Sequence, residues 1–172
     1  MHNILYFSRN PAKLCPSPAK LGRTLASPAG IGGGLRSTGI IIHGEWVAFQ
    51  LSSSWKVEGH DICWLETISI ELLALFLEST GHCNAHLLVH SDNQGTIGAL
   101  DKGRSGNIYI NLAVRCTHLI LMATSLVFKT IYIESHANPA DPISRREPGP
   151  AGKQMFPSFK LPDELSSCFL HA

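Results

Sequence analysis

The sequence predicts an α/β domain in which three antiparallel strands are followed by a helix, a strand, two helices and a last strand. Three observations support this prediction. Residues 38–57 alternate apolar runs with turn signals, residues 62–80 have the pattern of a long apolar helix, and residues 86–100 have the pattern of a short buried strand that passes directly into a helix. The chain of 172 residues, 44% of them apolar, is long enough for one domain with a sizeable core.

The first predicted element is a β-hairpin. The apolar runs Gly39–Ile42 and Trp46–Leu51 flank the pair His43-Gly44, and a turn pair between two apolar runs favours a tight hairpin. Residues 53–57 are expected to add a third strand. The domain is therefore predicted to open with three antiparallel strands.

Residues 62–80 are predicted to form a helix that packs on more than one side, because apolar residues occur nearly all round it. Polar and small residues recur along it at intervals of three and four: Thr67, Glu71, Ala74 and Glu78. This spacing places Glu71 on the narrow face that the core does not use. Glu71 is a candidate functional residue on this ground, and the alternative is an ordinary solvated helix residue.

The stretch 86–100 contains the central candidate, Asp92. The apolar run Leu87–Val89 predicts a buried strand, residues 94–100 predict the helix after it, and Asp92 falls at the joint, where Asn93 can cap the helix. Open α/β sheets bind their ligands at such strand ends. Asp92 is therefore a candidate binding or catalytic residue, and the alternative is that it serves only as a cap or turn residue.

The remaining elements complete the predicted domain, which covers residues 37–147. Residues 102–106 predict a flexible basic loop, and residues 108–124 predict a helix. Residues 126–133 predict a last strand, with an interruption near Lys129.

Both termini are predicted to lie outside this domain. Residues 1–36 are rich in Pro, Gly, Ser and Ala, and residues 148–172 contain several prolines, so neither composition favours a helix or a strand. We expect a poorly ordered leader and a flexible tail. Five basic and no acidic residues precede Glu45. The basic leader fits contact with a nucleic-acid backbone, an organellar presequence, or leader sequence that is not native to the domain.

Composition restricts the compartment and the class of protein. The five cysteines are scattered without a C-x-x-C spacing, which predicts free thiols in a reducing compartment. No run of 18 apolar residues occurs, so no membrane span is predicted. We expect an intracellular protein, cytoplasmic or nuclear. The motifs G-x-G-x-x-G and G-x-x-x-x-G-K are missing, which disfavours a nucleotide-dependent metabolic enzyme.

Three short strings resemble motifs of one family. Ser91–Gln94 followed by a helix, Ile70–Ala74, and Asn138–Arg145 are similar to motifs of the ribonuclease H-like (RNase H-like) domain of retrotransposon polyproteins, most closely those of the DIRS-like class. In these polyproteins the domain follows a reverse transcriptase. The resemblance covers residues 37–147. It implies an RNase H-like fold, a five-stranded mixed sheet that opens with three antiparallel strands and carries helices on both faces.

The resemblance also implies a nuclease, a hydrolase that cleaves RNA in RNA–DNA hybrids with Mg²⁺ or Mn²⁺ at a two-metal site. Two metal ions activate the water and stabilise the leaving oxygen, and Mg²⁺ prefers carboxylate oxygens. By the resemblance, the catalytic and metal-binding residues are Glu71, Asp92 and Asp141. The residues expected to contact nucleic acid are Asn93, Lys102, Arg104 and Arg145. The implied partners are an RNA–DNA hybrid or other nucleic acid and, in the parent element, a linked reverse transcriptase.

One feature of the family is missing. Its first strand carries an Asp that bridges both metals, but the corresponding run is Gly39–Ile42, and no acid precedes Glu45. Either the sequence upstream of the hairpin is not the ancestral one, as in a decayed transposable element or a mispredicted gene, or an acid such as Glu45 or Asp61 substitutes. We expect weak Mg²⁺ binding and little or no nuclease activity. The alternatives are a non-catalytic nucleic-acid-binding domain and a vestigial domain.

Overall fold

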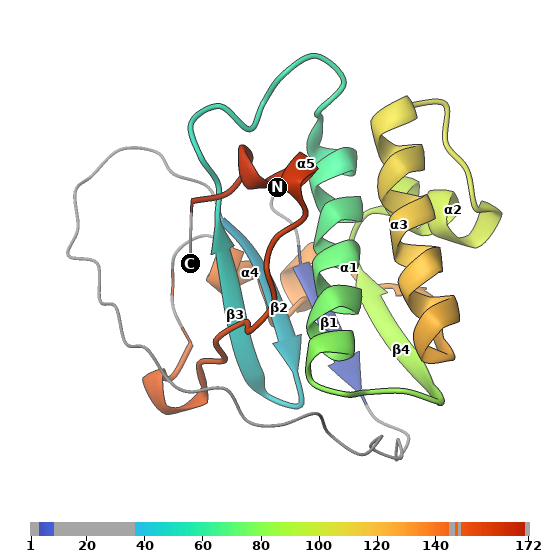
Figure 1. Ribbon diagram of the computed structural model, residues 1–172. Coiled ribbons are helices and arrows are strands. Elements are labelled where there is room, and N and C mark those ends of the chain that lie inside the picture. Colours follow the sequence, from blue (N-terminus) through green and yellow to red (C-terminus); the bar gives the residue numbers. More distant parts are fainter. Residues whose placement is uncertain (1–3, 9–36, 145–146, 148, 171–172) are drawn as a thin grey trace.

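The structure, a computed structural model, describes residues 4–8, 37–144, 147 and 149–170. Two helices dominate one face of a layer of strands, α1 (Ile62–Ser79) and α3 (Ile108–Thr124), as Figure 1 shows. The shorter α2 (Gln94–Lys102) packs beside them, against α1, α3 and the last strand. The described part of the chain is thus α/β, as the sequence predicts.

The strands from residue 37 onward form two pairs. The first is an antiparallel hairpin of β2 (Ser37–Ile42) and β3 (Glu45–Gln50), in which Ile42 lies opposite Glu45. His43 and Gly44 connect the two strands with φ values of 53° and 81°, the positive values that a tight hairpin turn requires. The second is a parallel pair of β4 (Ala85–Ser91) and β5 (Leu126–Tyr132), which is continuous through Lys129.

The predicted RNase H-like fold is wrong in its strand order and directions, because the sheet does not open with three successive antiparallel strands. The segments assigned to that sheet give only the antiparallel pair β2–β3 and the parallel pair β4–β5. Between the pairs lies β1 (Ile4–Ser8), which comes from the predicted leader and runs parallel to β2 but antiparallel to β4. The strand β2, predicted as the first strand of the domain, therefore does not pair with β4, the strand that precedes Asp92. The remainder of the leader, residues 1–3 and 9–36, lies outside the described residues.

Residues 53–57, predicted as a third strand, form a turn and a loop. The backbone carbonyl and the side chain of Trp55 contact residues outside the strand layer. The carbonyl oxygen of Trp55 lies 3.0 Å from Nδ1 of His60. The indole of Trp55 is buried and stacks on Trp64 of α1, with ring centroids 6.3 Å apart. The ring of His60 stacks on Trp64 as well, with ring centroids 3.7 Å apart. Aromatic burial against α1 thus takes the place of strand pairing.

The two faces of β2 hold different helices. The hydroxyl of Thr38 hydrogen-bonds that of Ser69 on α1, whereas the neighbouring Ser37 donates to the carbonyl oxygens of Ile143 and Ser144 in α4 (Asp141–Ser144). Successive residues of a strand point to opposite faces. Helix α4 therefore lies on the opposite side of the strand layer from α1.

The core surrounds α1. Its leucines Leu72, Leu73 and Leu77 are fully buried, and so are Ile40 of β2 and Val89 of β4, which lie on the sheet face beneath it. Helix α3 covers a further side of α1. The prediction that this helix packs on more than one side is confirmed.

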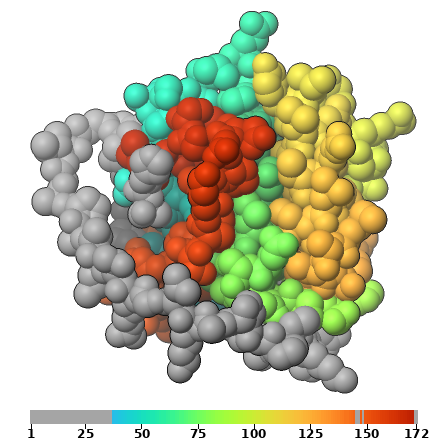
Figure 2. All heavy atoms as spheres, viewed as in Figure 1, coloured from blue at the N-terminus to red at the C-terminus, as the bar shows by residue number. Residues whose placement is uncertain are grey.

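The C-terminal segment, defined here as residues 154–170, covers the rest of α1 and the hairpin. Figure 2 shows it lying across both. The amide of Met155 donates to the carbonyl oxygen of Trp46, and that of Leu170 donates to the carbonyl oxygen of Gln50. Phe169 is buried and meets the ring of Phe49 at 6.3 Å. The expected flexible tail therefore packs as part of the core, because its apolar residues find the surface that the hairpin leaves uncovered.

Two further predictions concern the cysteines and membrane-spanning helices. Cys63, Cys116 and Cys168 have free thiols, but Cys83 is disulfide-bonded, so the prediction of free thiols is wrong for that residue. In the described ranges, no helix combines the length and the apolar character that crossing a bilayer requires.

We predict that Gly39→Ala destabilises the fold. A Cβ at this position would lie 2.9 Å from Cγ2 of Ile143 and 3.3 Å from the backbone nitrogen of Ser144, so α4 must move. We expect a loss of about 1–3 kcal/mol in the free energy of unfolding, measured by urea denaturation. The control is Gly98→Ala in α2, where nothing lies within 4 Å and the better helix former should stabilise by up to about 1 kcal/mol. Equal stability of Gly39→Ala and the parent chain would contradict the close packing of α4 on β2.

Candidate functional site

Asp92 follows the last residue of β4 and is half-buried. The hydroxyl of Ser135, in the 3-10 turn η1 (Ser135–Ala137), donates to Oδ2 of Asp92 at 2.6 Å. The other oxygen, Oδ1, is buried and accepts no hydrogen bond from the described residues. A buried carboxylate oxygen that lacks a donor is costly, and a bound cation is one physical remedy.

Asn93 orients the start of α2 beside Asp92. Its Oδ1 accepts from the backbone amides of Gly95 at 2.8 Å and Thr96 at 3.1 Å, so it caps the helix as predicted. The side chain of Asn93 also hydrogen-bonds Glu66 of α1. In addition, the hydroxyl of Thr96 donates to the carbonyl oxygen of Cys63 at 3.2 Å. These bonds hold the second turn of α1 against the end of β4.

Glu66 is the carboxylic acid that faces Asp92. Its side chain is only 6% exposed. Burial, and after it the negative charge of Asp92, raise the pKa of Glu66 to about 8, and the hydrogen bond from Asn93 opposes this rise. Glu66 therefore holds a proton at neutral pH. A pair of close acids that carries one proton is arranged to exchange that proton for a cation.

The structure does not bring Glu71 to this pair. Glu66 and Glu71 are five residues apart on one helix, which rotates them by about 140° around its axis. Glu71 is buried, at 4% exposure, and the charge that acts on its carboxyl group is that of Glu164 near the C-terminus. The polar stripe predicted from the sequence is therefore not one surface: the hydroxyl of Thr67 lies 3.5 Å from the hydroxyl of Thr96, Glu71 is buried, and Glu78 is exposed.

Asp141 is not grouped with Glu66 and Asp92 among the described residues. It begins α4, after a turn in which its amide donates to the carbonyl oxygen of Asn138 at 3.1 Å, and α4 packs on β2. Its Oδ1 is buried. Among the described residues, no three His, Cys, Asp or Glu side chains are grouped closely enough to hold a metal ion. The described acids thus supply the pair Glu66–Asp92 and no larger cluster.

The two acids considered as substitutes for the missing Asp have other roles. Oδ1 of Asp61 accepts from the amide of Trp64 at 2.7 Å and caps α1. Glu45 is exposed at the start of β3, next to the hairpin turn. Neither carboxylate adds to the Glu66–Asp92 pair, because Glu45 lies at the hairpin and the cap bond commits Asp61 to the helix backbone.

A basic groove lies along α2 and the loop after it. It has a volume of about 560 Å³ and begins at Gln94, directly after Asn93. Its lining residues are Gln94, Gly95, Gly98, Ala99, Lys102, Arg104, Ser105 and Gly106. Lys102 and Arg104 are exposed, so their charges face solvent above small residues. Arg145, the fourth residue expected to contact nucleic acid, lies outside the described residues.

Glu66 was missed because the sequence analysis used helix periodicity alone. The relative directions of α1 and β4 could have identified Glu66. Helix α1 leads into β4 through a short loop, so the two elements run in opposite directions and the N-terminal half of α1 lies beside the C-terminal end of β4. Glu66 is in that half. Glu71 lies about 7.5 Å farther along the helix, away from Asp92.

Comparison with known proteins gave no match: no family model, no curated protein and no solved structure is similar to this chain at a significant level. No membership of a family is therefore shown. The chemistry of the site has to be argued from the geometry of its own residues.

We predict that Asp92→Asn lowers the pKa of Glu66 from about 8, because it removes the negative charge that disfavours ionisation. The pKa stays above 4.5, since burial is the larger cause. The ¹³C chemical shift of the Glu66 carboxyl group, followed against pH by NMR, measures this change. Glu78→Gln, at an exposed position on the same helix, is the matched control and should leave the Glu66 titration in place. An unchanged pKa in Asp92→Asn would show that the two acids are not coupled.

Proposed function

We propose that this chain is a nucleic-acid-binding domain related to the RNase H-like domains of retrotransposon polyproteins, with a single weak Mg²⁺ site at Glu66 and Asp92. Its hydrolytic activity on the RNA of RNA–DNA hybrids is weak or absent. The observation that carries this proposal is the acid pair at the end of β4: burial, and after it the charge of Asp92, raise the pKa of Glu66, and Oδ1 of Asp92 is buried without a donor among the described residues. The resemblance of Ser91–Gln94 and Asn138–Arg145 to the family's motifs supports it.

The residues present fit one hard cation. Mg²⁺ is commonly held by one or two carboxylates, with waters and substrate phosphate completing its shell. Oδ1 of Asp92 is buried and accepts no hydrogen bond from the described residues, which suits a ligand oxygen. Ser135 holds the other oxygen of Asp92, and Asn93 holds Glu66 in place. A second ion would need further carboxylates, and the described residues do not group them there.

The residues of the site have separable tasks in this proposal. A bound Mg²⁺ ion supplies charge stabilisation to a phosphoryl oxygen and makes a water a better nucleophile. Glu66 must release its proton before it can act as a ligand, so binding strengthens as pH rises through about 8. Asp92, with one oxygen fixed by Ser135, is the oriented ligand. Proton release at Glu66 couples cation binding to pH.

Weak activity follows from the small number of acids. Hydrolysis by two metals requires both the attacking and the leaving oxygen to be stabilised, and two carboxylates supply ligands for one ion only. The sequence has no acid before Glu45, so the strand that pairs with β4, Ile4–Ser8, brings no carboxylate to the end of β4. The site can then bind a cation and a phosphate without completing the displacement.

The basic groove supports nucleic acid as the partner. Lys102 and Arg104 are the cations that line the groove, and Gly98 leaves it open, since a Cβ there would meet nothing within 4 Å. Two cations on one groove can neutralise two phosphates of a strand. This observation equally favours a second candidate function, a non-catalytic domain that binds nucleic acid without any metal.

We predict weak Mg²⁺ binding that depends on Glu66 and Asp92. Glu66→Gln and Asp92→Asn should each lower the affinity about tenfold or more, because each removes a ligand charge. The measurement is a Mg²⁺ titration followed by the NMR shifts of the Asp92 and Asn93 amides. Glu71→Gln is the discriminating variant and should leave the affinity unchanged within about twofold, since Glu71 faces Glu164.

Hybrid cleavage in Mg²⁺ or Mn²⁺ is measured on the same proteins. We expect no turnover above the protein-free rate. Robust cleavage that Asp92→Asn abolishes would overturn the proposed inactivity, and the absence of any Mg²⁺-dependent shift at Asp92 would overturn the metal site.

We predict that Lys102→Gln combined with Arg104→Gln weakens binding to an RNA–DNA hybrid. The slope of log affinity against log salt should fall by about 1.8, from two lost phosphate contacts. Gel-shift titrations at several salt concentrations measure it, with Lys56→Gln, at an exposed position on another loop, as control. Binding that survives EDTA identifies the non-catalytic candidate. Failure to bind a hybrid at any salt concentration would contradict a nucleic-acid role.

A further inference from the structure

Helix α3 presents an apolar stripe to solvent on the side that faces away from the core. Its buried residues, among them Ile110, Val114 and Thr117, lie together on the other side of the helix. The stripe, as the name is used here, consists of Ile108, Leu112, Arg115, Leu119 and Met122. Its large apolar side chains are 52% to 77% exposed, and Figure 2 shows α3 open along its length. A surface helix normally carries polar residues on this side, so the stripe indicates a surface that another molecule covers.

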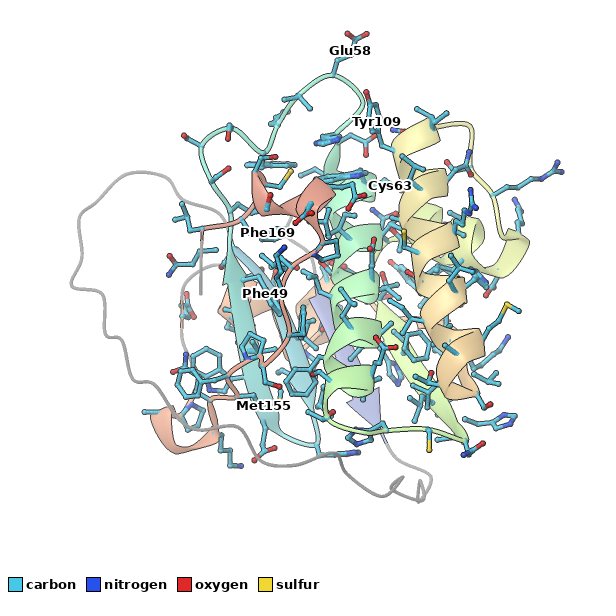
Figure 3. All side chains as sticks on the ribbon, viewed as in Figure 1. Phe49, Glu58, Cys63, Tyr109, Met155 and Phe169 are labelled. Carbon is cyan, nitrogen blue, oxygen red and sulfur yellow. The ribbon has the colours of Figure 1, made fainter. Side chains whose placement is uncertain are left out.

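The side chains next to the stripe are held elsewhere. Tyr109, labelled in Figure 3, packs its ring against that of His60 in the loop before α1, with ring centroids 4.9 Å apart. Nδ1 of His118 lies 2.7 Å from the carbonyl oxygen of Val114, within α3 itself. Neither ring folds over the stripe, which is therefore accessible to another molecule.

The spacing of the stripe fits a second helix of the same sequence. Its residues follow one another at alternating intervals of four and three, the repeat that two packed helices share. The stripe is also nearly symmetric about Arg115, with Ile108 and Met122 at equal separations on either side. Leu112 and Leu119 flank the same centre. An antiparallel copy of α3 would therefore bring apolar residues opposite apolar residues along the stripe, as a two-fold interface requires.

We propose that α3 forms an antiparallel helix pair with α3 of a second copy of this chain, so that the domain self-associates as a weak two-fold dimer. Leu112 of each copy then packs against Leu119 of the other, and Ile108 packs near Met122. Self-association does not depend on the proposed metal site, because α3 contributes no residue to the acid pair or to the lining of the basic groove.

The size of the stripe suits a weak dimer. Helix α3 has 17 residues and is therefore about 25 Å long. Two helices packed along this length bury on the order of 1,000 Å² in total, which is at the lower end for specific protein interfaces. We therefore expect a Kd on the order of 10–100 µM.

The charge on the stripe favours a second copy over a membrane or a nucleic acid. Arg115 is the single charged residue of the stripe, whereas a helix face that binds anionic lipid or phosphates carries several cations. In the dimer, the two Arg115 side chains approach each other near the two-fold axis, and each extends its guanidinium group to solvent at the rim. Their repulsion opposes association, which agrees with a weak dimer.

Sedimentation velocity of the full chain, between about 1 µM and 1 mM, tests the proposal. We expect a shift from monomer to dimer over this range. Leu112→Lys and Leu119→Glu should each weaken the dimer about tenfold or more, because each places an unpaired charge in the interface. The double variant carries Lys opposite Glu at two symmetric positions and should regain most of the lost affinity.

Two further variants sharpen the test. Val57→Lys is the matched control, since Val57 is 53% exposed on a loop away from α3, and it should leave self-association unchanged. Arg115→Met removes the repulsion near the two-fold axis and should tighten the dimer about tenfold. All these positions are exposed, so the folded state should persist, as urea denaturation checks.

Cross-linking locates the interface. Cys116 is an exposed free thiol beside Arg115, so the two-fold axis brings the thiols of two copies close together. A short bismaleimide should join two copies of the parent chain, and Cys116→Ser should abolish this product. A chain that stays monomeric up to about 1 mM would overturn the proposal and leave another protein or a lipid surface as the occupant of the stripe. Dimerisation that Leu112→Lys leaves intact, or that the double variant does not restore, would overturn the antiparallel pairing of α3.

Discussion

The burial of α1 on nearly every side is the constraint on which the rest of the structure depends. A helix of 18 residues with apolar side chains around its whole circumference is stable only if each side is covered. Each fully buried leucine contributes about 1.5–3 kcal/mol relative to an exposed one. The strand layer, α3 and the C-terminal segment each cover one side, as Figures 1 and 2 show. The last of these explains why a proline-rich terminus is ordered.

The same constraint produces both ionisable sites. Glu66 and Glu71 lie on α1, so covering the helix buries both carboxylic acids, and burial is the main cause of both raised pKa values. Their surroundings then give them different chemistry. Glu66 meets Asp92 and Asn93 at a strand end. Glu71 is on a different face of the helix, where the charge of Glu164 acts on it.

Local patterns located most elements closely. The helix predicted at residues 108–124 is observed with the same ends, and the hairpin has its turn at His43 and Gly44. Asp92 lies at the predicted joint, and Asn93 caps α2 as expected. These features depend on interactions between residues close in the chain. The prediction of a third strand is wrong because Trp55 is buried by stacking on Trp64 of α1, a contact between elements that no local sequence pattern reports.

The sequence by itself determined the helices, the hairpin and the position of one acid at the end of a strand, because periodicity, turn residues and caps act over a few residues. Tertiary structure alone decided which strand pairs with β4, that the C-terminal segment covers α1, and that Asp92 meets Glu66 and not Glu71. The physical reason is that these outcomes depend on which surfaces remain uncovered after the local elements form. The hydrophobic effect is non-directional, so an exposed apolar surface can be covered by any segment of the chain that can reach it, however distant in the sequence.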